Sequence, residues 1–158
     1  MKINYHIVKI NFRLIDKGLP IPTQTEDNTG IDLYSRLDIT IQPHTMQLVP
    51  LNVIVFLGER YNNKELIDPM GSFLFPRSSL FSKYNLIMTN SVGVIDASYR
   101  GPNDEVKAAL YNMGNEPVII PRGERICQLV CLTYITPMII IVDETSSIES
   151  RGGFGSTG

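Results

Sequence analysis

Short apolar segments, rich in Val and Ile and separated by Gly, Pro, Asn and Asp, run along most of this chain. β-branched residues favour strands, and the separating residues are those that turns require. The one helical candidate covers residues 78–84, with Ser78 or Ser79 as its N-cap. Many short strands with one small helix indicate an all-β sandwich, jelly roll or barrel. The predicted strands are 3–13, 37–42, 46–57, 71–75, 86–90, 92–95, 105–112, 117–120, 125–135 and 138–142.

The two ends of this pattern differ. Residues 1–142 carry the strands and are predicted to form the β domain, whereas 143–150 (DETSSIES) are polar and indicate a linker. The last segment, 151–158 (RGGFGSTG), has four Gly among its eight residues and one large apolar side chain, so it cannot form its own core. Free backbone amides, two hydroxyls and an arginine could cradle an anion, and the phenyl ring could cover a flat ligand. Residues 143–158 are therefore predicted to be a flexible arm, with a frayed terminus as the alternative.

Composition excludes several classes of protein. The chain has 158 residues, enough for one domain with a sizeable core. Its net charge of -2 and pI near 5.6 argue against binding to a nucleic-acid backbone. No apolar run approaches the roughly 18 residues of a membrane helix, and the start lacks a signal peptide's apolar block. We expect no nucleic-acid or membrane partner and a cytoplasmic location, in the host if a virus or phage encodes the chain, with the nucleus as an alternative.

Cys127 and Cys131 are the only cysteines. Both lie in an apolar segment, RICQLVCLT, that reads as an interior strand covered on both faces. We expect two reduced, buried thiols, because the two histidines lie far away in sequence without ligand spacing.

Two segments could bind phosphate. In PRSSL (76–80), Arg77 and two hydroxyls stand at the start of the predicted helix, where free N–H groups attract anions. A capped helix with a surface arginine is the alternative. Gln128 is the only polar side chain between Ile126 and Leu132, so it needs a partner, either structural or a phosphate oxygen or its water.

Two further segments carry carboxylates. NSVGVIDASYRG (90–101) resembles a hairpin with bends at Gly93 and Gly101, and Asp96 between apolar neighbours could orient and deprotonate a water. Tyr99 could lie flat against a sugar; an ordinary hairpin with a turn carboxylate is the alternative. In TGIDLYS (29–35), Asp32 follows a glycine bend and could hold a metal, pair with an arginine or serve only as a turn residue.

Together these segments resemble the five ordered motifs of the trimeric dUTPase family. The motifs are TGIDLYS (29–35), PRSSL (76–80), NSVGVIDASYRG (90–101), RGERICQLV (122–130) and RGGFGSTG (151–158). The resemblance implies a β jelly roll, or distorted barrel, with one short helix. It also implies a homotrimer with active sites at subunit boundaries, and hydrolysis of dUTP to dUMP and pyrophosphate. Such an enzyme limits uracil in DNA and supplies dUMP for dTMP synthesis.

The resemblance also implies roles for individual residues. Asp96 would be the general base that activates water for attack on the α-phosphorus, and Tyr99 would pack on the deoxyribose. Mg²⁺ would bind mainly through the phosphates and water, with Asp32 supporting the site and a possible ligand. Uracil's edge would contact Asn90 and the backbone of Gly93, Val94 and Ile95. The phosphates would contact Arg77, Ser78, Ser79 and Gln128. From the arm, Phe154 would stack on uracil, and Arg151, Gly155, Ser156 and Thr157 would bind the distal phosphates.

Three departures from the family pattern stand out. Ser79 occupies a position where many members have glycine, and Pro102, Asn103 and Asp104 form an insert before Glu105. With this insert the chain resembles a phage and Bacillus-type subgroup more than the usual bacterial or animal members. Arg151 also stands two residues closer to the arm's phenylalanine than the pattern expects, which leaves its phosphate contact open.

Two other functions compete with this one. A dCTP deaminase shares the fold and the Arg-Ser-Ser element, but it needs a catalytic glutamate on the strand after the hairpin. Here that strand reads VKAALYN, with no acid after Glu105. A dUTPase-fold protein could also serve as a nucleotide-gated interaction module, whose nucleotide-binding motifs would be the same.

Overall fold

The structure, a computed structural model, describes residues 10–25, 27–57, 70–135 and 137–141. Within these ranges the chain is almost entirely β-structure with one short helix, as the sequence predicts. The elements in chain order are β1 (Ile10–Leu14), β2 (Ile31–Tyr34), β3 (Ile39–Ile41), β4 (Met46–Pro50), β5 (Val53–Leu57), β6 (Met70–Pro76), α1 (Leu80–Tyr84), β7 (Leu86–Met88), β8 (Gly93–Ile95), β9 (Lys107–Asn112), β10 (Val118–Ile120) and β11 (Arg125–Thr133).

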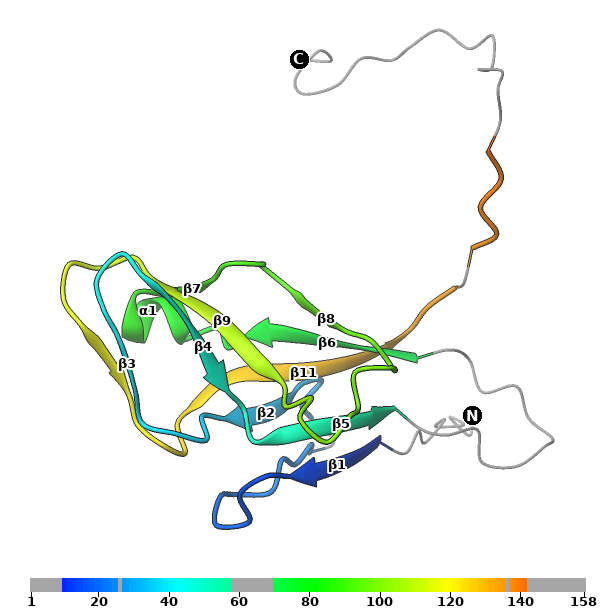
Figure 1. Ribbon diagram of the computed structural model, residues 1–158, viewed down its shortest axis with the longest axis horizontal. Helices are drawn as coiled ribbons and strands as arrows, with labels where there is room; N and C mark the ends of the chain where they lie inside the picture. The colour runs from blue at the N-terminus through cyan, green and yellow to red at the C-terminus, as the bar shows by residue number, and fades with distance from the viewer. Residues whose placement is uncertain (1–9, 26, 58–69, 136, 142–158) are drawn as a thin grey trace, which may run out of the picture.

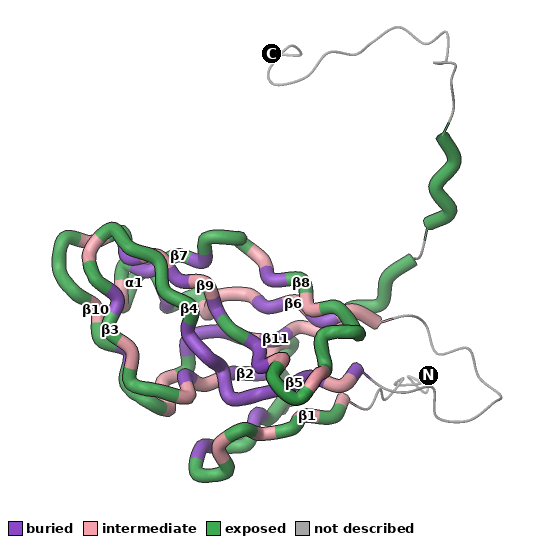
Figure 2. Tube along the Cα trace, in the orientation of Figure 1, coloured by how far each residue is buried: buried purple, intermediate pink, exposed green. Residues whose placement is uncertain are grey.

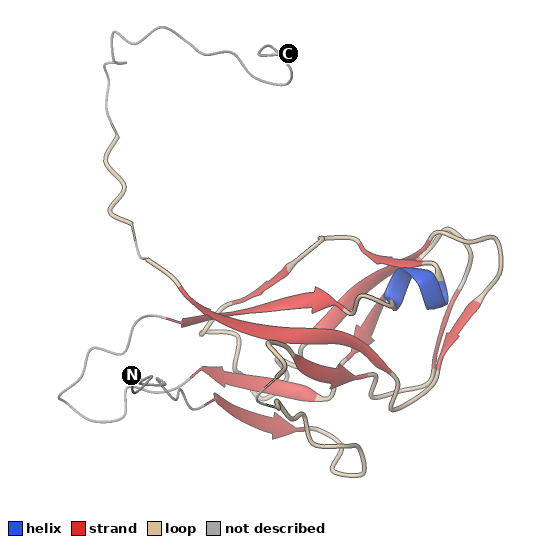
Figure 3. Cartoon of the chain, turned by 180° about the vertical axis from the view of Figure 1, so that it is seen from behind, coloured by secondary structure: helices blue, strands red, loops and turns tan. Residues whose placement is uncertain are grey.

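In the described ranges the strands form four antiparallel sheets around one core. The largest has the order β2-β11-β6-β8, the next β4-β9-β7, and two pairs are β1-β5 and β10-β3. β11 crosses the middle of the fold between β2 and β6 (Figure 1), and α1 lies at one end beside β7 (Figure 3). This arrangement is the predicted distorted β-barrel of jelly-roll type.

The core follows the period-two alternation of strands. On β9 the pattern places Ala108, Leu110 and Asn112 inward, each fully buried, between half-buried or exposed neighbours. Figure 2 shows buried residues along β2, β5 and β9. Fully burying one such apolar side chain contributes about 1.5–3 kcal/mol. The core therefore depends on strands from all parts of the chain.

Both cysteines of β11 are free thiols. Cys127 is fully buried, as predicted, and burial raises the pKa of its thiol to about 12. Cys131 is only half-buried, and burial also raises its pKa. The Cys127 thiol lies 3.9 Å from the Met88 sulfur, so it packs as a small core residue.

Two strand predictions need correction, and a third is tested only in part. The predicted strand 46–57 is split into β4 and β5 by Asn52, whose φ of 68° turns the chain; Asn tolerates this left-handed region better than most residues. Residues 138–141 form no strand, and Met138, Ile139, Ile140 and Ile141 are 71–89% exposed. An apolar run predicts a strand only where a neighbour can pair with it. Of the predicted strand 3–13, residues 3–9 lie outside the described ranges.

The helix begins two residues later than predicted. It starts at Leu80 with Ser79 in the N-cap position, but the Ser79 side chain makes no capping hydrogen bond. The helix ends at Tyr84, and the C-cap residue Asn85, with a φ of 55°, closes the last turn by donating its backbone N–H to the Phe81 carbonyl. Both serine hydroxyls of PRSSL therefore stay outside the helix cap.

Alternation on β10 predicts opposite effects for two adjacent isoleucines. Ile120 is fully buried, whereas Ile119 is 66% exposed. Replacing Ile120 with Ala should lower the free energy of unfolding by about 2–5 kcal/mol, because it leaves a cavity. Ile119→Ala is the matched control and should change it by about 0.5 kcal/mol or less. Denaturant unfolding at one fixed protein concentration measures both, and equal losses would contradict the assigned faces.

Candidate functional site

Asp32 joins two arginines at one edge of the large sheet. Its carboxylate accepts from Arg77 Nε at 3.0 Å and from Arg125 Nη1 at 3.2 Å. The sequence left open whether Asp32 would hold a metal or pair with an arginine. In the structure Asp32 pairs with two arginines. One carboxylate and two guanidiniums leave a net positive charge, which suits an anionic ligand.

The start of α1 lies beside this cluster. The Arg77 N–H donates to the carbonyl of Ile126 at 3.1 Å, which fixes the chain as it leaves β6. Ser78 and Ser79 are exposed. A hollow of about 340 Å³ opens here, lined by Pro76, Arg77, Ser78, Leu80, Phe81, Leu86, Ile87, Met88 and Ser91. Of the residues predicted from PRSSL to bind phosphate, Arg77 and Ser78 thus line a concave surface, whereas Ser79 is not among its lining residues.

Gln128 has a structural partner. It lies opposite Asp32 in the register of β11 and β2, and its Nε2 donates to the carbonyl of Pro76 at 3.2 Å. An added Cβ at Gly30 would stand 2.2 Å from the Gln128 Oε1, so Gly30 is required for this close approach. Of the two partners left open for Gln128, the backbone carbonyl is the one observed.

The segment 90–101 is not the predicted hairpin. β8 (Gly93–Ile95) pairs with β6, while the preceding β7 pairs with β9. Ser91, with a φ of 56°, redirects the chain between them. The edge of β6 was free to accept β8, and Gly93 lets the two strands approach, since an added Cβ would lie 3.2 Å from the Leu74 Cβ. Gly93 therefore lies inside a strand and not at a bend.

Asp96 follows β8 and is exposed in the single chain, so the expectation of a carboxylate held in a β pocket is wrong for one chain alone. Its carbonyl accepts the Tyr99 N–H at 2.9 Å. Asn90 and Val94, predicted to meet the base, are also exposed, and Ile95 is half-buried. The predicted uracil and water positions therefore lie on an open surface of the chain.

The Tyr99 side chain is held by a hydrogen bond from its hydroxyl group. Its hydroxyl donates to the carbonyl of Glu105 at 3.0 Å, and burial, together with Asp104 and Glu105, raises the pKa of that hydroxyl. The Pro102–Asp104 insert forms a closed turn, because the Gly101 N–H donates to the Asp104 carboxylate at 2.6 Å and the Asp104 N–H donates back to Gly101 at 3.1 Å. In the sequence, the insert thus lies between Tyr99 and Glu105, whose carbonyl accepts from the Tyr99 hydroxyl.

Sequence reasoning missed Arg125, Arg36 and the role of Glu105. Arg125 stands just before the apolar run of β11, where only Gln128 drew attention. Arg36 and Glu105 are 69 residues apart and form a paired contact at 2.8 and 2.9 Å. No spacing rule connects two residues at that separation, so only the fold brings them together.

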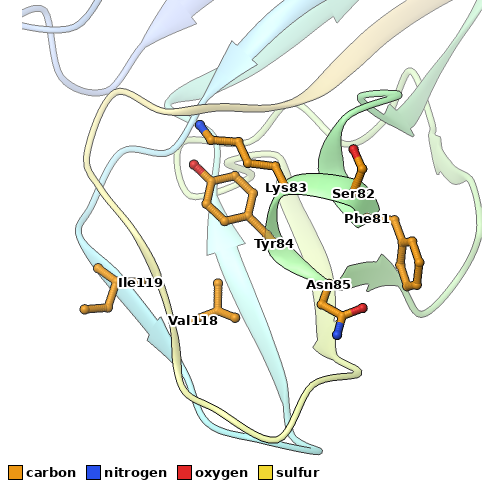
Figure 4. Close-up of a pocket in the computed structure, with 7 residues that line it drawn as sticks. All are labelled: Phe81, Ser82, Lys83, Tyr84, Asn85, Val118 and Ile119. Carbon is orange, nitrogen blue, oxygen red and sulfur yellow. The ribbon is translucent and has the colours of Figure 1, made fainter.

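A larger hollow, of about 570 Å³, lies elsewhere (Figure 4). It is lined by Phe81, Ser82, Lys83, Tyr84, Asn85, Val118 and Ile119, and no predicted site residue in the described ranges is among them. Lys83 Nζ pairs with Glu124 at 2.6 Å and lies 4.6 Å from the centroid of the Tyr84 ring. The Glu124 contact raises the pKa of Lys83, and Lys83 in turn lowers the pKa of Glu124. The smaller hollow is the better candidate site, because it is lined by Arg77, which belongs to the cationic cluster around Asp32.

Five predicted site residues lie outside the described ranges: Arg151, Phe154, Gly155, Ser156 and Thr157. In the ranges that are described, no three His, Cys, Asp or Glu side chains gather as a metal site. The described part of the chain also has no helix of the length and apolarity that crossing a membrane requires.

Comparison with known proteins gives a consistent result. The dUTPase family model matches residues 17–158. The chain is 35% identical over 156 residues to the deoxyuridine 5'-triphosphate nucleotidohydrolase of Caldanaerobacter subterraneus subsp. tengcongensis, covering 96% of this chain and 97% of that protein. It is 33% identical over 159 residues to the enzyme of the same name from Haemophilus influenzae, covering 95% and 97%.

Solved structures agree with the fold. A dUTPase from Streptococcus mutans superposes with a TM-score of 0.67 at 29% identity, covering 80% of this chain and 98% of that one. The dUTPase of Staphylococcus bacteriophage 80alpha, solved with dUPNHPP, gives a TM-score of 0.75 at 23% identity, covering 95% and 98%, which supports the fold alone. From the motifs, the jelly-roll fold and these matches, the chain belongs to the dUTPase family.

Proposed function

We propose that this chain hydrolyses dUTP to dUMP and pyrophosphate. The observation that carries the proposal is the cationic cluster of Asp32, Arg77 and Arg125 beside the exposed hydroxyl of Ser78. Within a dUTPase-family chain, this is the described surface best suited to a triphosphate.

The proposed chemistry needs one base. Asp96 accepts a proton from a water molecule while the oxygen of that water attacks the α-phosphorus. The bond between the α-phosphorus and the oxygen that bridges it to the β-phosphorus then breaks, and pyrophosphate leaves. Arg77, Ser78, Ser79 and Gln128 orient the phosphates, and Arg125 adds a second positive group. Asp32 supports the site by holding both guanidiniums. Most of the rate enhancement then comes from positioning and charge neutralisation.

The substrate's other groups fit the neighbouring segment. Backbone groups around Gly93, Val94 and Ile95, with Asn90, are proposed to read the edge of uracil, since β8 is an edge strand with one side unpaired in its sheet. Tyr99 is proposed to pack on the deoxyribose. From the arm, Phe154 stacks on the base, and Arg151, Gly155, Ser156 and Thr157 reach the distal phosphates.

Register favours an active site shared between copies of the chain. β6 and β8 are antiparallel with Ile95 opposite Ser72, so Asp96 continues away from the end of β6 that carries Arg77. At about 3.3 Å per residue, the two backbone positions are about 15–20 Å apart. This is too far for both to serve one triphosphate, so a second copy is needed to complete each site.

An apolar sheet face supports such assembly. On the outer side of the β4-β9-β7 sheet, Met46 and Leu48 are 52% and 49% exposed, and Ile87 is 39% exposed. Their partners in register include Tyr111 and Ala109, so the residues form one continuous surface. We propose a homotrimer in which faces of this kind are covered.

Mg²⁺ is proposed to bind through phosphate oxygens and water, the hard ligands that it prefers. Both Asp32 oxygens already accept from arginines, so Asp32 fits a role in holding guanidiniums better than a role as metal ligand. When bound, the ion neutralises phosphate charge. The protein's own part is to hold the triphosphate in the matching orientation.

Pyrophosphate release in the presence of Mg²⁺, compared for dUTP, dCTP, dTTP and UTP, tests the proposal. We expect turnover of dUTP with at least about tenfold weaker turnover of the others, because the base edge and the sugar are both read. Ammonia release from dCTP without dUTP hydrolysis would instead indicate a deaminase. A deaminase would need Glu105 as a free acid, but in this structure Glu105 is buried and paired with Arg36.

Asp96→Asn should reduce the turnover number for dUTP at least about 100-fold, because the amide cannot accept the proton from water. Binding of a non-hydrolysable dUTP analogue should persist, since the exposed side chain supports no core contact. Pyrophosphate release and calorimetry measure the two quantities. Normal turnover by this variant would contradict the assignment of the base.

Removal of residues 150–158 should leave a folded assembly with at least about tenfold lower activity, because the arm closes the site. Phe154→Ala is the narrower variant and should weaken analogue binding by about 1–3 kcal/mol, the range for base stacking on an aromatic ring. Size-exclusion chromatography controls for assembly. Full activity of the truncated chain would rule out the arm's proposed role.

A further inference from the structure

Tyr99 is tied to both ends of the loop that contains it. Its N–H donates to the Asp96 carbonyl at 2.9 Å, and its hydroxyl donates to the Glu105 carbonyl at 3.0 Å. The residue is 37% exposed, so packing alone does not fix its ring. The orientation of the ring therefore depends on where the Glu105 carbonyl lies.

The Glu105 backbone is held by its own side chain. Oε1 accepts from Arg36 Nε at 2.8 Å and from the Asn52 N–H at 2.9 Å, and Oε2 accepts from Arg36 Nη2 at 2.9 Å. The Glu105 side chain is only 9% exposed, and the contact raises the pKa of Arg36. This forked, charge-assisted pair is the geometry that holds a carboxylate most firmly.

Neighbouring backbone bonds make the pair part of a rigid frame. The Leu51 N–H donates to Val106 and the Val106 N–H donates to Val53, both at 2.9 Å, while the Arg36 N–H donates to Pro50 at 2.9 Å. Arg36 and Glu105 are thus attached to the same turn between β4 and β5. Displacing the Glu105 carbonyl would break a mostly buried charge pair, which is costly.

A rigid anchor at this position has a specific use. The residues between Tyr99 and Glu105 include the Pro102–Asp104 insert, which lengthens the loop and would otherwise let the ring shift. A small shift of a ring packed on a sugar decides whether a 2′-hydroxyl can be admitted, because discrimination depends on close approach. The anchor opposes that shift.

We propose that Arg36 and Glu105 are positioning residues that hold Tyr99 against the deoxyribose and so set the preference for dUTP over UTP. The proposal rests on the proposed function, in which Tyr99 packs on the sugar. Neither Arg36 nor the Glu105 side chain touches the substrate in this role; they act through the Glu105 carbonyl and the Tyr99 hydroxyl.

The test measures kcat/KM for dUTP and for UTP in the wild type, Arg36→Met, Glu105→Gln, Tyr99→Phe and the double variant Arg36→Met with Tyr99→Phe. Each single variant should lower the dUTP/UTP ratio by about tenfold, the size expected when one positioned hydrogen bond is lost. The double variant should lose no more than the worse single variant, because all changes act through one contact. Glu105→Gln keeps the shape of the side chain and carries the test if Arg36→Met does not fold.

Arg122→Met is the matched control. It breaks an Arg–carboxylate pair with Asp16 at 2.7 Å that is more exposed and makes no contact with Glu105. The control should leave the dUTP/UTP ratio unchanged. A lowered melting temperature with an unchanged ratio in Arg36→Met and Glu105→Gln would overturn the proposal, because it would leave a purely structural role. Absence of dUTP turnover in the wild type would instead overturn the proposed function itself.

Discussion

Backbone pairing of β11 with strands on both of its sides is the constraint on which the candidate site depends. Its register sets Gln128 opposite Asp32 on β2 and Cys127 opposite Pro76 on β6. Residues from three distant parts of the chain, Asp32, Arg77 and Arg125, therefore meet at one edge. Because side chains alternate along a strand, a slip of one residue would turn Asp32 and Gln128 to the opposite face and separate the cluster.

The same sheet is the reason we propose a site shared between copies of the chain. β8 pairs antiparallel with β6, so the strand that brings Gly93 toward the cationic cluster carries Asp96 away from it. In the proposed shared site, copies of the chain would be arranged around one another. The surroundings of Asp96 would then come from another copy, which would account for its exposure in the single chain.

The local sequence pattern predicts the features that depend on neighbouring residues, such as strands and bends. Val and Ile segments predicted most strands, and the glycine bend predicted before Asp32 lies at Gly30. The close approach of Gly30 to Gln128 was not predicted and comes from the structure. Pairing partners are decided over long distances, so the hairpin at 90–101 was wrong and residues 138–141 were mistaken for a strand. The partners of Asp32 were left open for the same reason: Arg77 and Arg125 are fixed by strand register and not by spacing along the chain.

The Arg36–Glu105 pair is more buried than the cationic cluster around Asp32. This difference in burial fits the different roles that we propose for them. Arg36 and Glu105 satisfy each other almost completely, with the Glu105 side chain 9% exposed, so the pair can fix backbone but cannot exchange partners. Asp32 is 27% exposed and shares its two oxygens between Arg77 and Arg125, which leaves guanidinium N–H groups for another anion. In the proposed roles, a pair that holds Tyr99 in place would gain from burial. Groups that bind and release phosphates would gain from solvent, since screening lets phosphate contacts form and break. One chain thus carries both kinds of electrostatic environment, a buried pair and a more exposed cationic cluster.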